Sequence, residues 1–134
     1  MHIFKETMCT AAGFIVGCAS YFLGGFSPIV SVFMTILIID TLTGMLKAWN
    51  KGEYESKKFR SGFVKKSGYL IGVLLTVQID ILLNTHGVLR DAVLTFFIAN
   101  ESFSIIENLG EMGIQFPEKV TAAIKSLNND KKED

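Results

Sequence analysis

An uncharged run of 33 residues, from Thr7 to Ile39, constrains this chain more than any other feature. A helix on the surface of a soluble protein shows about half of its circumference to water, so charged residues recur along it. About 20 apolar residues are enough to cross the roughly 30 Å of hydrocarbon in a bilayer. A second uncharged run covers Ser67 to Ile79. These runs predict a single all-α membrane domain, residues 1–134, that crosses the bilayer several times.

The remaining composition excludes two other classes of protein. Thirteen Lys and Arg residues balance thirteen Asp and Glu residues, so the positive field that attracts nucleic acid is missing. Cys9 and Cys18 lie about 13 Å apart along one helix, which is too far for a disulfide bond. The two cysteines therefore do not indicate a disulfide-stabilised secreted domain.

The apolar residues gather into several candidate membrane spans. A signal peptide resembles the first span, but another apolar span follows it directly, as expected for two helices joined by a tight turn. Pro28 suits the first turn of the second span and Trp49 suits the membrane interface. The predicted spans are residues 8–23, 28–49, 68–83 and 88–109.

A basic loop, residues 50–66, sets the expected orientation. Loops rich in Lys and Arg stay in the cytoplasm, so this loop places the turns at 24–28 and 84–87 outside. Four crossings then put both termini in the cytoplasm. The residues expected to orient the chain and to meet lipid are Lys51, Lys57, Lys58, Arg60, Lys65 and Lys66.

The fourth span has two interpretations. It contains Arg90, Asp91, Glu101 and Glu107, so it either crosses with its ionisable face in a helix bundle or lies at the interface as an amphipathic helix. Four crossings are favoured over three, because the fourth returns the lysines of the tail, residues 117–134, to the cytoplasm. In this tail, an apolar spacing predicts a short amphipathic helix before a charged end at 130–134; the spaced residues are Val120, Ile124 and Leu127.

The sequence lacks the residue patterns of common enzymes. His2 and His86 are the only histidines, and the predicted topology puts them on opposite sides of the membrane. Metal-binding and glycine-rich phosphate-binding motifs are also missing. We therefore expect no catalytic residue, no metal and no cofactor.

Asp40 is the most informative single residue. A carboxylate at the centre of a membrane helix costs about 2.5 to 3.5 kcal/mol on insertion scales, so it should face protein or water. Thr43, Gly44 and Lys47 share its helix face. Two interpretations are open: Asp40 is satisfied by a neighbouring helix and holds the bundle together, or it lines an aqueous path.

Two further polar stripes follow. Asp80 lies one turn from Thr76 and from Asn84, and Arg90 is its expected ion-pair partner across the outer turn. The last stripe either lines a bundle or forms the wet side of an interfacial helix; its residues are Asn100, Ser104, Glu107, Asn108 and Glu111.

Two pairs of glycines are spaced one helical turn apart. Such pairs let helix backbones approach closely in a membrane, within one chain or between chains. The pairs are Gly13 with Gly17 and Gly68 with Gly72.

Two blocks carry a resemblance to a known family. The first is Asp40-Thr41-Leu42-Thr43-Gly44-Met45-Leu46-Lys47-Ala48, followed by Gly52, Ser56 and Gly62-Phe63-Val64-Lys65-Lys66. The second is Asn100-Glu101, Ser104-Ile105-Ile106-Glu107-Asn108-Leu109-Gly110 and Gly113, continuing into the segment from Pro117 to Leu127. In these blocks, over about residues 30–127, the chain resembles phage holins of the toxin-secretion and lysis family.

The resemblance implies a non-enzymatic protein of the bacterial cytoplasmic membrane. Such proteins form homo-oligomers and open lesions that release an endolysin, or in some cases a toxin, for host cell lysis. The expected partners are membrane lipid, further copies of the chain and an endolysin, with an antiholin left open. The polar residues implied in oligomer or pore are those of the stripes above, including Asp40, Asp80, Glu101 and Glu107.

Two rival functions remain open. A small proton-coupled transporter also uses membrane carboxylates, although this chain shows no internal repeat. A membrane adaptor or regulator would use its basic loop on anionic lipid. Expression in bacteria separates them, because a holin gives delayed and abrupt loss of membrane potential.

Overall fold

A computed structural model describes residues 1–53 and 56–129, with only the backbone given at 128 and 129. In this part of the chain every regular element is an α-helix, which confirms the all-α prediction. The helices are α1 (His2–Phe22), α2 (Pro28–Lys51), α3 (Ser56–Leu83), α4 (Val88–Glu111) and α5 (Glu118–Asn129).

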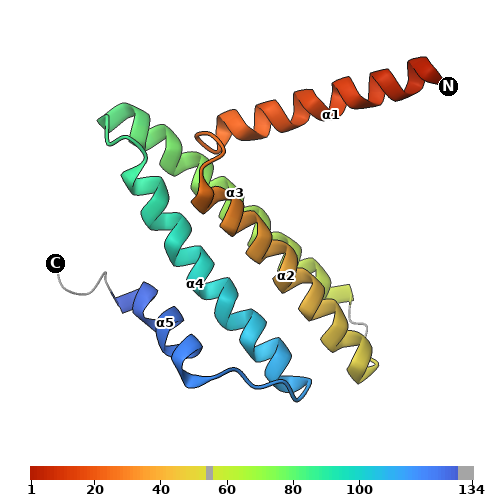
Figure 1. Cartoon of the computed structure of the whole chain (residues 1–134), viewed down its shortest axis with the longest axis vertical. Helices are drawn as coiled ribbons and strands as arrows, with labels where there is room; N and C mark the ends of the chain where they lie inside the picture. The colour runs from red at the N-terminus through yellow and green to blue at the C-terminus, as the bar shows by residue number, and fades with distance from the viewer. Residues whose placement is uncertain (54–55, 130–134) are drawn as a thin grey trace.

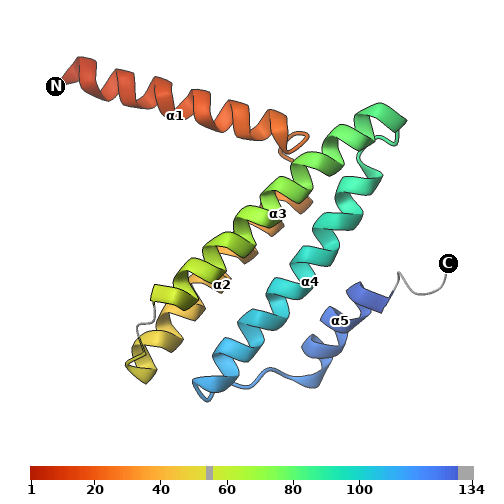
Figure 2. The same ribbon diagram turned by 180° about the vertical axis from the view of Figure 1, so that it is seen from behind.

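Helices α2, α3 and α4 form a bundle, and α4 packs against both of the others (Figure 1). Helix α1 diverges from this bundle, and α5 folds back along α4; both features are also visible from behind in Figure 2. The turns at 23–27 and 84–87 meet at one end of the bundle, which we call the hairpin end. The other end, where α2 and α4 finish and α3 begins, we call the basic end.

Local sequence explains where the helices begin and end. Pro28 occupies the first turn of α2, where its missing N–H removes no hydrogen bond. Gly52 ends α2 in the left-handed conformation, with φ of 65°. Gly24 and Gly25, with φ of 77° and 98°, make the sharp turn between α1 and α2.

The core of the bundle lies in its hairpin half and is apolar. Each helix of the bundle contributes buried side chains to it, and the outward faces of α2 and α3 expose many large apolar residues, as lipid-facing helices do. Among the described residues, α2 and α3 are long and apolar enough to cross a membrane. The buried core residues are Val30, Phe33, Leu37, Val73, Val77, Leu94 and Ile98.

The segment 50–66 differs from the loop that we expected. Helix α3 already begins at Ser56, so most of this basic segment is helical, while residues 54 and 55 lie outside the described part. The segment 57–61 has no helix breaker, and Lys and Arg are good helix formers, so the helix extends beyond the apolar run. Helix α5 forms where the spacing of Val120, Ile124 and Leu127 predicted one. The charged end at 130–134 lies outside the described residues.

One of the four spaced glycines makes a helix contact in this chain. The ring of Phe97 on α4 lies 3.5 Å from the position that a Cβ at Gly72 would occupy. Nothing lies within 4 Å of that position at Gly13, Gly17 or Gly68. Only Gly72 therefore brings two helices of one chain together.

Candidate functional site

Four charged side chains meet where α2, α3 and α4 come together in the basic half. The Lys66 ammonium of α3 donates to Asp40 Oδ2 of α2 at 2.9 Å. It also donates to Thr41 Oγ1 at 2.7 Å and to the main-chain oxygen of Leu37 at 3.1 Å. Lys66 thus satisfies all three of its donors on α2. We call the four charges the charge network: Asp40, Lys65, Lys66 and Glu101.

Glu101 is the most deeply buried member of the network. Its side chain is fully buried, and its oxygens lie 2.8 Å from the Lys65 ammonium and 3.8 Å from that of Lys66. Neither oxygen accepts a hydrogen bond of good geometry from the described residues. An unpaired buried charge would be strongly unfavourable, so these ion pairs are what makes the position of Glu101 tolerable.

Neutral polar side chains extend the network along α2 and α4. The Asn108 amide of α4 donates to Thr43 Oγ1 at 3.2 Å and to Asp40 Oδ1 at 3.4 Å. The same amide nitrogen lies 3.8 Å from where a Cβ at Gly44 would sit, so the missing side chain leaves room for it. Ser104 lies one turn from Asn108 and interacts with the Asp40 carboxyl.

A second cluster of ion pairs joins α2 and α4 at the basic end. Glu111 at the end of α4 pairs with Lys51 and, at 3.5 Å, with Lys47, both on α2. The hydrogen bond from Lys51 and the charge of Lys47 lower the pKa of Glu111, and the hydrogen bond to Glu111 raises the pKa of Lys51. The cluster is about half exposed, so solvent screens it.

At the hairpin end, the expected ion pair between Asp80 and Arg90 is not formed. Asp80 is buried and instead caps the first turn of α4, accepting hydrogen bonds from the backbone N–H groups of Leu89, at 3.1 Å, and Arg90, at 2.8 Å. Thr85 donates to the same carboxylate. The free N–H groups of a helix start are strong partners for a carboxylate, which explains why they win over the guanidinium.

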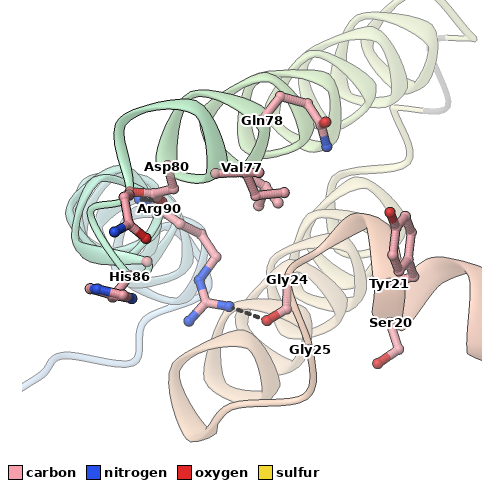
Figure 3. Close-up of a pocket in the computed structure, with 12 residues that line it drawn as sticks. Ser20, Tyr21, Gly24, Gly25, Val77, Gln78, Asp80, His86 and Arg90 are labelled. Atoms are coloured by element: carbon pink, nitrogen blue, oxygen red, sulfur yellow. Dashed lines mark hydrogen bonds between the residues drawn. The ribbon is translucent and has the colours of Figure 1, made fainter.

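The Arg90 guanidinium holds the turn between α1 and α2 instead. It donates to the main-chain oxygen of Gly24 at 2.8 Å (Figure 3). It also donates to the main-chain oxygen of Leu23 at 3.3 Å and to Ser27 Oγ at 3.3 Å. Asp91 takes its remaining donors. Beside this contact lies a pocket of about 590 Å³. The donors of Arg90 are used within the chain, so the pocket offers little to an anion.

The structure divides the residues singled out in the sequence. Asp40, Thr43, Glu101 and Ser104 come together around the network, and Lys47 lies nearby in the second cluster. Glu107 is exposed, and Asn100 is partly buried without a side-chain hydrogen bond in the described part of the chain.

The basic residues also fall into two groups, which the sequence did not predict. Both Lys65 and Lys66 were expected to orient the chain. Lys66 is mostly buried against Asp40, and the half-exposed Lys65 reaches in to Glu101. One feature of the sequence could have indicated this. Both lysines directly precede the uncharged run that starts at Ser67, so they are close enough to the apolar segments to pair with acids on the neighbouring helices.

The chain is similar to known proteins along most of its length. The sequence model of the bacteriophage holin family matches residues 17–129 of this chain. The uncharacterized protein YqxH of Bacillus subtilis (strain 168) is 35% identical over 128 residues, which cover 96% of this chain and 86% of that protein. The uncharacterized protein Lmo0128 of Listeria monocytogenes is 40% identical over 98 residues, covering 73% of this chain and 70% of its own.

A third relative carries a functional name. The probable holin of Bacillus phage phi105 is 32% identical over 125 residues, covering 93% of this chain and 87% of that protein. No solved structure matches the chain. The family match covers most of the chain, including every helix that builds the charge network. The chain therefore belongs to the bacteriophage holin family.

Proposed function

We propose that this protein oligomerises in the cytoplasmic membrane of a bacterial host and opens lesions that release an endolysin or a toxin. The observation that carries the proposal is the charge network, in which Glu101 is fully buried and Asp40 and Lys66 are mostly buried between three helices of a chain from the holin family. Buried charges that are paired only with one another are stable while the bundle is closed, and they gain water when it opens.

The proposed topology has four crossings, with the basic end and both termini in the cytoplasm. Helix α4 suits a crossing, because the only ionisable residue between Asp91 and Glu107 is Glu101, which is buried. Helix α1 is uncharged from Thr7 onward and exposes its apolar side chains, as lipid requires. In this topology the turn at Gly24 joins α1 to α2, and α1 enters the membrane beside the bundle.

The proposed lesion starts in the basic half. Copies of the chain accumulate as closed bundles, and contacts between their helices compete with the contacts inside each bundle. Once enough copies have gathered, the side chains around Asp40 and Glu101 exchange their internal partners for water and line the opening. Glycines without an internal contact, such as Gly13 and Gly17, provide surfaces where neighbouring copies approach.

The test is expression in bacteria with a dye that reports membrane potential. The wild-type chain should cause a delayed and abrupt loss of potential, and a co-expressed endolysin should then lyse the culture. Asp40→Asn should shift the time of onset, because Lys66 loses a charged partner. The matched control is Glu118→Gln, which removes the charge of an exposed carboxylate on α5 and should leave the onset unchanged.

Two results would count against the proposal. A gradual loss of potential that follows a supplied substrate would indicate a transporter. An unchanged onset for Asp40→Asn, at equal protein level, would remove Asp40 from the opening step and leave it a packing role only.

A further inference from the structure

The first turns of α3 form an unpartnered surface that carries both cations and aromatic rings. Phe59 and Phe63 are 65% and 69% exposed, and Lys57 and Arg60 are also exposed. Neither Lys57 nor Arg60 has an ion pair among the described residues, whereas Lys58 pairs with Glu53 at 3.6 Å. Lys57, Arg60 and Phe63 follow one another at intervals of three residues, so these three side chains lie along one side of the helix.

The side of α3 that carries Lys57, Arg60 and Phe63 faces away from the rest of the bundle, whereas Phe59 lies two turns before Lys66 and shares its side. On the same helix Lys65 and Lys66 point at Glu101 and Asp40, and Gly62 is partly buried on their side. The helical wheel places Phe63 and Arg60 outside that side of the helix. An exposed ring beside two exposed cations suits a partner that accepts a ring and cations together, as a lipid surface does.

The depth of these residues identifies the partner. At about 1.5 Å per residue, a 20-residue crossing that ends at Leu83 begins near Val64. Arg60 and Lys57 then lie about 6 and about 10 Å beyond the hydrocarbon. The headgroup layer on each side of a bilayer is about 5 to 7 Å thick, so the long side chains of both residues reach the lipid phosphates. Phe63 lies at the edge of the hydrocarbon, about 1.5 Å from its boundary.

We infer that this surface binds the phosphate groups of anionic phospholipids at the cytoplasmic face, through Lys57 and Arg60, while Phe63 enters the acyl-chain boundary. Basic side chains near a membrane surface attract anionic lipid, and adjacent aromatic rings anchor a helix at the interface. The lysines of the basic segment thus have two separate tasks, since Lys65 and Lys66 neutralise acids inside the bundle. This inference rests on the proposed membrane topology, but it does not require lesion formation.

The test uses Trp49, the only tryptophan in the chain, as a local reporter. Trp49 is 71% exposed near the end of α2, a few residues before α3 begins. The full-length protein is reconstituted into two preparations of phosphatidylcholine vesicles. Each preparation contains one-third phosphatidylglycerol. The bromine atoms that quench tryptophan are carried by the anionic lipid in one vesicle and by an equal amount of the neutral lipid in the other.

The expected result is stronger quenching of Trp49 by brominated phosphatidylglycerol than by brominated phosphatidylcholine. This preference should fall to about one in K57Q/R60Q and persist in the control K119Q/K125Q, which removes two exposed lysines from α5. Equal quenching by both lipids in the wild-type chain, or an unchanged preference in K57Q/R60Q, would overturn the inference. The vesicle experiment measures only lipid contact. It therefore tests the lipid-binding inference even if the protein forms no lesions in cells.

Discussion

In the hairpin half of the bundle the buried side chains include Val30, Phe33 and Leu94, whereas the basic half buries Thr43, Glu101 and Asn108. Apolar side chains gain little by leaving lipid for protein, so the apolar core of the hairpin half is held by close packing, with the hydrogen bonds of Asp80 and Arg90 at its end. The polar side chains have a second favourable environment, which is water. The proposed opening step therefore belongs to the polar half, which can exchange one set of partners for another, while the apolar half stays closed.

The largest effect should come from removing the central cation of the network. Lys66→Met leaves Asp40 without its ion-pair partner and Glu101 with Lys65 alone, and breaking a buried ion pair costs about 3–5 kcal/mol. The free energy of unfolding in mixed detergent micelles measures this loss. Lys58→Met is the control, since its exposed pair with Glu53 contributes at most about 1 kcal/mol. Equal losses in the two variants would show that the network does not hold the basic half closed.

The next largest change in the free energy of unfolding should come from placing a polar side chain in the apolar half, compared with an apolar side chain in the polar half. Leu94→Asn buries an amide without a partner in the apolar half and should cost about 1–3 kcal/mol. The reverse change in the basic half, Asn108→Leu, removes the hydrogen bonds to Thr43 and Asp40 and should cost about 0.6 kcal/mol, as is usual for such bonds in membranes. The same unfolding measurement applies, and a larger cost for Asn108→Leu would contradict the division into two halves.

The hairpin end provides a smaller and well-controlled test. Alanine at Gly24 or at Gly25 forces a left-handed backbone on a residue with a Cβ, which costs about 1–2 kcal/mol. A Cβ at Gly24 would also lie 2.9 Å from Arg90 Nη1, whereas nothing lies within 4 Å of one at Gly25. Gly24→Ala should therefore destabilise the protein more than Gly25→Ala. In an Arg90→Gln background the difference between the two should disappear.

The cluster at the basic end should give the smallest effect and a clear dependence on pH. The lowered pKa of Glu111 means that its stabilising effect is present above the usual glutamate pKa and is lost as the pH falls through the lowered value. The raised pKa of Lys51 acts in the opposite direction, so its effect is lost only as the pH rises through the raised value. An NMR titration of the Glu111 carboxyl should show its pKa returning toward the ordinary value in Lys51→Gln. An unchanged titration would show that the two residues do not interact in solution.

The helices were largely predictable from sequence because charge placement decides which segments a membrane accepts. The uncharged runs predicted α2 and the second half of α3, and Pro28 predicted where α2 begins. The start of α3 at Ser56 was missed, because a run of lysines suits an exposed helix as well as a loop.

The site was predictable only in part, because spacing along one helix does not identify the neighbour on another. The face of Asp40, Thr43 and Gly44 was predictable from a period of 3.6 residues. That Lys66 is the partner of Asp40 depends on how α3 packs beside α2, a contact between residues 26 apart in the sequence. Asp80 was assigned the wrong partner for the same reason, since backbone N–H groups leave no trace in a sequence.

A reversible crosslink across the basic half tests the proposed opening step most directly. Thr43→Cys and Asn108→Cys replace side chains whose polar atoms lie 3.2 Å apart on α2 and α4, in a chain whose own Cys9 and Cys18 are changed to serine. In a host strain with an oxidising cytoplasm, where the disulfide can form, the protein should accumulate in the membrane without loss of potential, and a reducing agent should then trigger the loss abruptly. Loss of potential at the usual time, while the disulfide is fully formed, would contradict an opening in the basic half.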